Sequence, residues 1–192
     1  VFLMDAITYL VVIAIFVSMK YTSIAKDKTH VDGIMERLKG GFSYLKNHTI
    51  IFVFGFASSM LFAFTLVQVH VILPSYVDRF LKMDGNIYAS AEIYYSFGAI
   101  MAGLLILRIF KRFNTVFGVI VLMMVVSLAF YAMSVYDILW VFFLGNFVLG
   151  ITNAGVRILK TTYLFNHVPN NLIGRTNSVF GFLNTVVRML LI

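Results

Sequence analysis

Residues 115–134 read TVFGVIVLMMVVSLAFYAMS, and the only polar side chains before the end of this run are Thr115 and Ser127. An α-helix rises about 1.5 Å per residue, so about 20 residues cross the hydrocarbon core of a bilayer, which is about 30 Å thick. The run therefore predicts a membrane-spanning helix. Because it is apolar on all sides, we expect lipid to cover most of its surface.

Five further apolar runs of similar length lie on either side of it. They cover residues 1–19, 50–72, 88–107, 138–157 and 176–192. The whole chain is 61% hydrophobic, whereas ordinary soluble domains are about 45–50% apolar. Six spans in 192 residues leave no room for a soluble domain. The sequence thus predicts an all-α integral membrane protein, a polytopic helical bundle.

The formal net charge is +7, but its distribution argues against a nucleic-acid partner. Most basic residues fall on every second polar segment: Lys20, Lys26, Lys28, Arg37, Lys39, Lys46, Arg108, Lys111, Arg112, Arg157, Lys160 and Arg175. The positive-inside rule places that side in the cytoplasm, so residue 1 begins outside. We expect a multi-pass protein of a bacterial inner (plasma) membrane.

The segment 20–49 predicts structure of its own. Val31, Ile34, Met35, Leu38, Phe42 and Leu45 recur at helical spacing among charged residues. At about 14 residues such a helix is too short to span, and it suits the cytoplasmic membrane interface. An ordinary surface linker helix is the alternative. In either case the segment separates the span 1–19 from the five spans of 50–192.

The sequence contains no motif that indicates a catalytic or a cofactor site. The chain has no cysteine, and it contains no zinc-protease, nucleophile-elbow or phosphate-loop motif. We therefore expect neither a metal nor a cofactor, and no enzyme activity.

One apolar run carries a polar stripe. Its members step by three or four residues and so share one helix face: Asn146, Gly150, Asn153, Arg157, Lys160 and Thr161. An unpartnered amide costs several kcal/mol in hydrocarbon, so the stripe should face protein or water. It either lines a cavity or packs against another helix, since Gly150 and Ala154 form a small-xxx-small pair.

Four more residues are candidates for substrate binding or coupling. Gln68 and His70 lie near the predicted outer end of one span, and Glu92 near the outer start of the next. They could relay protons, or simply meet headgroups and water. Arg188 lies deep in the last span, where a cation needs a carboxylate, a water cavity or an anionic substrate. Structural pairing or snorkelling to the outer face is the alternative.

Two segments resemble cytoplasmic motifs of the major facilitator superfamily. The first contains Gly98, Gly103, Arg108, Lys111 and Arg112, and is similar to the basic turn between the eighth and ninth helices. The second, from Pro169 through Gly174 and Arg175 to Ser178, resembles the Gly-Arg turn before the eleventh helix of the drug- and macrolide-efflux-like branch. The chain then resembles the sixth to part of the eleventh helix of that family, as an internal fragment.

This resemblance implies a fold of two six-helix halves around a cavity, which alternates its access. Residues 1–19 would end the N-terminal half, and 50–192 would form five spans of the C-terminal half. The first two helices of each triplet would line the cavity, here 50–72, 88–107, 138–164 and 176–192.

The implied function is secondary active transport, namely efflux of a small drug-like solute driven by a proton gradient. The implied partners are the bilayer, the solute, protons and the missing N-terminal half. The alternatives are a non-transporting membrane sensor or scaffold and an intramembrane enzyme.

Overall fold

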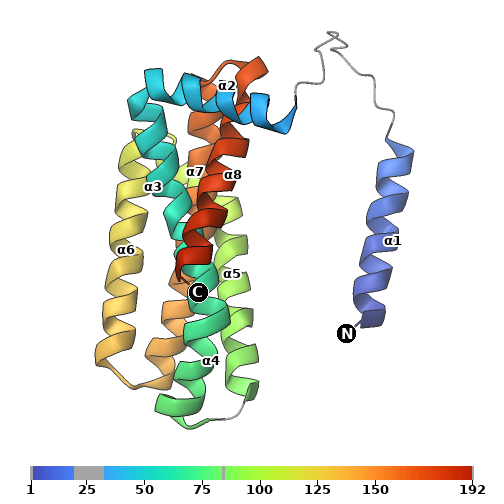
Figure 1. The fold of residues 1–192 in the computed structure, drawn as a ribbon. Coiled ribbons are helices and arrows are strands. Elements are labelled where there is room, and N and C mark those ends of the chain that lie inside the picture. The colour runs from blue at the N-terminus through green and yellow to red at the C-terminus, as the bar shows by residue number, and fades with distance from the viewer. Residues whose placement is uncertain (1, 20–32, 84, 192) are drawn as a thin grey trace. The chain divides into compact units, whose positions relative to one another are not determined.

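The computed structural model describes residues 2–19, 33–83 and 85–191, in which every regular element is a helix (Figure 1). The chain divides into two compact units, Val1–Gly33 and Ile34–Ile192. The first unit contains α1 (Phe2–Ser18), which fills the predicted run 1–19. Residues 20–32, the first part of the predicted linker, lie outside the described residues.

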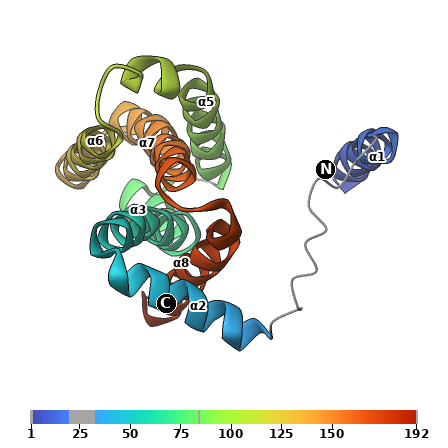
Figure 2. The same cartoon turned by 90° about the horizontal axis from the view of Figure 1, so that it is seen from above.

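The predicted short amphipathic helix is α2 (Ile34–Asn47). It crosses one end of the bundle, against α8 and α3 (Figures 1 and 2). Leu45 is buried there, whereas Met35 and Phe42 are exposed. A helix with apolar side chains on its outer surface as well as its inner one suits a membrane interface.

The next helical segment is longer than the predicted run 50–72. α3 (Thr49–Val67) continues through a π-helical segment η1 (Gln68–Ile72), α4 (Leu73–Tyr76) and a second π-helical segment η2 (Val77–Leu81). Pro74 explains the first wide turn, because proline cannot donate to the carbonyl four residues earlier and its ring crowds that carbonyl. Lys82 ends the helix in the left-handed conformation, with φ 50°.

Four antiparallel helices complete the bundle: α5 (Gly85–Phe110), α6 (Thr115–Val135), α7 (Leu139–His167) and α8 (Asn170–Leu191). Asn114 caps α6, since its side chain accepts a 3.0 Å hydrogen bond from the Val116 amide. α8 begins six residues before the predicted 176, and the Pro169 carbonyl accepts its first hydrogen bonds. Gly174 and Arg175, expected in a turn, therefore lie within the helix.

Among the described residues, four helical segments are long and apolar enough to cross a membrane: Thr49–Leu81, α5, α6 and α7. α8 has 22 residues but is more polar, and the described part of α1 has 17. The all-α, multi-pass membrane class expected from the sequence is confirmed.

α7 is the central helix of the second unit, as Figure 2 shows end-on. It packs against α5, α6 and α3, while α8 packs against α3 and α2. α6 lies at the periphery: Val119, Leu122 and Val126 are buried, but Ile120, Met124 and Leu128 on its other side are exposed. This agrees with the lipid-facing position predicted for the run 115–134.

α5 and α7 approach each other at two facing glycines. A Cβ added to Gly98 would overlap the Phe147 carbonyl oxygen, and one added to Gly150 would overlap the Tyr95 carbonyl oxygen. Small residues of this kind let helix backbones come into contact inside a membrane.

Candidate functional site

The polar stripe of α7 divides into two parts with different surroundings. Asn146 is 1% exposed, and its Nδ2 donates a 2.9 Å hydrogen bond to the Phe142 carbonyl of its own helix. Asn153 is 3% exposed, and its Nδ2 donates to the Tyr95 hydroxyl of α5 at 2.5 Å. Gly150 and Asn153 thus lie at the contact between α7 and α5. The Asn153 Oδ1 atom is buried without a hydrogen-bond partner.

The second part of the stripe meets α3 and α8 instead. The guanidinium of Arg157 lies 5.3 Å from the centre of the Phe62 ring, and this arginine is exposed. The Lys160 amine donates a 2.7 Å hydrogen bond to the Ser59 hydroxyl of α3. The same amine lies 5.1 Å from the centre of the Phe180 ring of α8.

Ser59 joins the three helices. Its hydroxyl donates to the Gly55 carbonyl at 2.6 Å while it accepts from Lys160, and its own carbonyl accepts a 2.8 Å hydrogen bond from the Asn184 amide of α8. Gly55 is required here, because a Cβ at that position would overlap the Phe180 ring. We call Arg157, Lys160, Ser59 and Asn184 the cationic cluster.

No carboxylate forms a salt bridge with Arg157 or Lys160 among the residues that the structure describes. The acidic side chains described in this unit are Glu36, Asp78 and Glu92 on helices and Asp137 in the loop between α6 and α7. Of these, the last three lie at the end of the bundle away from α2. Two like charges one helical turn apart repel each other, and within a membrane such charges are expensive unless something compensates them.

Arg188 lies on α8 one turn beyond Asn184 and is half-buried. It is about 27 Å along the helix from Asn170, at about 1.5 Å per residue. Within the described residues no ion pair joins Arg188 to Glu92.

The proposed relay residues stay apart. His70 is exposed and its Nδ1 lies 2.9 Å from the Leu66 carbonyl, one turn earlier on its own helix. Glu92 is half-buried one turn after Tyr88, whose hydroxyl donates to the Val69 carbonyl at 3.4 Å. This contact ties α5 to η1 at the level of His70. The part of the chain that the structure describes shows no contact between His70 and Glu92 themselves.

The residues of the two predicted motifs have different surroundings. Gly98 lies in the middle of α5, against α7, and Gly103 is exposed. Arg108, Lys111 and Arg112 are exposed at the end of α5 and in the loop that follows. Gly174 is also exposed on α8.

Arg175 packs against α2. A Cβ on Gly40 would lie 3.1 Å from the Arg175 Nη1 atom, and a Cβ on Gly41 would lie against the Arg175 carbonyl oxygen. The two glycines therefore allow α2 to contact α8 closely.

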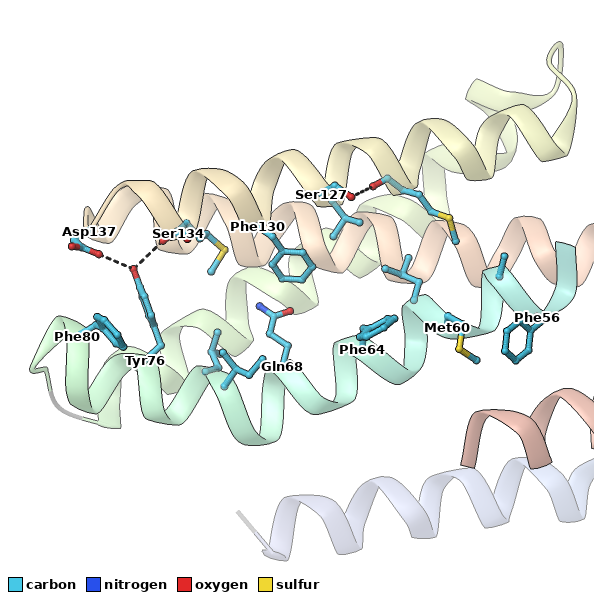
Figure 3. Close-up of a pocket in the computed structure, with 17 residues that line it drawn as sticks. Phe56, Met60, Phe64, Gln68, Tyr76, Phe80, Ser127, Phe130, Ser134 and Asp137 are labelled. Carbon is cyan, nitrogen blue, oxygen red and sulfur yellow. Dashed lines mark hydrogen bonds between the residues drawn. The ribbon is translucent and has the colours of Figure 1, made fainter. Parts of the chain in front are cut away.

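A groove of about 1030 Å³ lies between the Thr49–Leu81 segment and α6 (Figure 3). Aromatic and methionine side chains line most of it, and Gln68, which is 6% exposed, is its buried polar member. At one end the Tyr76 hydroxyl donates to the Met133 carbonyl at 3.1 Å and to the Asp137 carboxylate at 3.4 Å. The sequence indicated Gln68 but not the groove.

The cationic cluster, rather than the groove, is the candidate functional site. The groove is apolar and lies beside the peripheral helix α6, whereas the cluster holds Lys160 between three helices with the exposed Arg157 one turn away. Cations inside spans mark substrate or ion pathways. The sequence pointed to Arg157 and Arg188, but it did not single out Ser59 and Asn184, whose side chains are neutral and common in helix contacts.

The family model of the Major Facilitator Superfamily matches residues 1–191. No curated protein matches the chain, and no solved structure does.

Proposed function

The chain belongs to the major facilitator superfamily, a family of membrane transporters, and on that premise we propose that it forms part of a secondary active exporter. Its substrate would be a small drug-like solute, and its cycle would be alternating access between the two sides of the membrane. The energy would come from a proton gradient.

The observation that carries this proposal is the cationic cluster. Arg157 is exposed although it lies within α7, a helix long and apolar enough to span the membrane. Lipid would not stabilise a guanidinium there, and we propose that a water-filled cavity reaches it. A cavity of this kind between α3, α7 and α8 is what a transporter requires and what a scaffold lacks.

The other half of the transporter would close this cavity. Thr161 on α7 and Asn177, Ser178 and Thr185 on α8 are exposed as well. Polar side chains at such depth indicate a surface that meets water or protein. We propose that the N-terminal half of the family fold faces this surface.

For coupling we propose His70 and Glu92. Both are titratable, and Tyr88 ties their two helices together at the end of the bundle away from α2. Histidine and carboxylate side chains form the proton relays of many pumps and transporters.

Transport by the full-length protein in proteoliposomes tests the proposal. Arg157→Leu should lose most of its activity, whereas Ile120→Ala on the exposed side of α6 should keep it. A proton gradient imposed across the membrane should drive accumulation of the solute, and dissipating that gradient should stop it. Equal activity of the two variants would contradict the role of the cluster, and no transport of any solute would favour the sensor or scaffold.

A further inference from the structure

The cations near the middle of the bundle lie at similar depths. Lys160 of α7, Ser59 of α3 and Asn184 of α8 are held at one level by their hydrogen bonds. α7 runs opposite to α3 and α8. Arg157 therefore lies about 4.5 Å from that level, and Arg188 about 6 Å from it, both toward the end away from α2, at about 1.5 Å per residue. Three positive charges thus occupy a short stretch of the bundle.

The contacts of Lys160 and Arg157 leave both positive charges uncompensated, which suggests a ligand. The Lys160 amine is held by a neutral hydroxyl and an aromatic ring, which orient it but do not neutralise it. The Arg157 guanidinium lies over the Phe62 ring, and it makes no hydrogen bond among the described residues. A guanidinium offers five donors in a planar fork that matches a carboxylate or a phosphate.

From this geometry we propose that the substrate is an organic anion, whose charged group binds Arg157 and Lys160. The inference rests on the proposed transport function and adds the charge of the substrate to it. A carboxylate, sulfonate or phosphate supplies the compensating charge that the described residues do not. Ser59 and Asn184 act as positioning residues, since they hold Lys160 and α8 in place around the anion.

Binding of a matched pair of fluorescent probes tests this. Dansylglycine carries a carboxylate, and dansylglycinamide is its neutral counterpart. For the full-length protein in phosphatidylcholine nanodiscs, we expect the anion to bind at least about tenfold more tightly than the amide, as one charge-assisted hydrogen bond provides. Equal affinities for the two probes would overturn the proposal.

Variants locate the binding site. Arg157→Met and Lys160→Met should each weaken dansylglycine binding by about tenfold or more and leave the amide unchanged. Lys160→Arg should retain most of the affinity. Arg79→Met and Lys46→Met, which remove exposed cations at the two ends of the bundle, are the matched controls. Thermal unfolding of each variant shows that it folds. Unchanged anion affinity in both cluster variants would mean that these charges are compensated within the protein, and would overturn the site.

Two further outcomes separate the possible sources of the anion and the two proposals. Phosphatidylglycerol in the nanodiscs, at a salt concentration that screens the membrane surface, should leave dansylglycine binding intact. If it abolishes that binding, the cations belong to a lipid headgroup and the solute site is wrong. If charge-dependent binding persists but no gradient drives movement of dansylglycine or any other solute, the anion site stands and the transport function fails.

Discussion

Asn153 and Tyr95 form a hydrogen bond between two apolar helices, and its contribution to the free energy of unfolding can be measured. Replacing Tyr95 by phenylalanine removes the acceptor of the Asn153 amide, whose Oδ1 already lacks a partner. Hydrogen bonds between membrane helices contribute about 0.6 kcal/mol on average and up to about 1.7 kcal/mol.

We therefore expect Tyr95→Phe to lower the free energy of unfolding by about 0.6 to 1.7 kcal/mol, measured by denaturant titration in detergent. Tyr94→Phe is the control, because Tyr94 stacks on Phe143 through its ring and keeps that contact without its hydroxyl. An equal loss in both variants would show that the Asn153 hydrogen bond contributes nothing of its own.

Arg188 gives a second prediction, for transport. Arg188→Lys should keep part of the activity because the charge remains, although the bidentate fork is lost. Arg188→Met should insert and accumulate normally but transport little. The measurement is solute flux in proteoliposomes, normalised to the amount of protein inserted. Flux at the wild-type rate in Arg188→Met would eliminate the role, and failure of this variant to accumulate would indicate a structural ion pair instead.

The contact between α5 and α7 depends on glycine. We expect Gly98→Ala to lower the stability by about 1–3 kcal/mol, the usual cost of overpacking, because the new methyl group meets the backbone of α7. Gly150→Ala should lower the stability by a similar amount, because its methyl group would meet the backbone of α5. Gly103→Ala adds a methyl group to the same helix with no heavy atom within 4 Å, and alanine favours a helix over glycine by about 0.5–1 kcal/mol.

Unfolding of the three alanine variants in detergent provides the comparison. Gly103→Ala should be as stable as the wild type or slightly more so. If Gly98→Ala is equally stable, the two helices do not approach each other as the structure places them.

The same helices show what the sequence could predict. Apolar runs located α5, α6 and α7 to within a few residues, apart from the long C-terminal end of α7, because hydropathy and helix length are local properties. The start of α8 was placed too late, since its first turns contain the polar residues Asn170, Asn171 and Arg175 and extend beyond the apolar run. The two wide turns after α3 were not predicted, because only Pro74 hints at them.

The candidate site was partly predictable for a similar reason. A charged residue within an apolar run can be recognised from the sequence alone, so Arg157 and Arg188 were predicted. Ser59, Asn184 and Tyr95 were not, since their importance depends on which helices meet. The stripe of α7 was predicted as one face. In the structure one part of it packs against α5, and the other, charged part contacts α3.

The orientation of the whole bundle remains a prediction from its charges, and the structure offers exposed positions to test it. Lys46 and Lys111 lie at the end crossed by α2, and Lys82 lies at the other. The 192-residue chain has no cysteine of its own. Cysteines at Lys46 and Lys111 should resist a membrane-impermeant maleimide in intact cells and react after lysis, whereas a cysteine at Lys82 should react at once. The reverse pattern would invert the topology.

The wide turns after α3 have a geometrical consequence. The groove is lined from one helical segment at every fourth position: Met60, Phe64, Gln68, Ile72, Tyr76 and Phe80. In a regular α-helix four residues turn about 40° more than one revolution, so five such steps would rotate the row by about 200°. The π-helical segments contain more residues per revolution and cancel this angular drift. If η1 were wound as a regular α-helix of the same length, the following side chains would turn further around the helix axis, and the Tyr76 hydroxyl would then point away from the Met133 carbonyl.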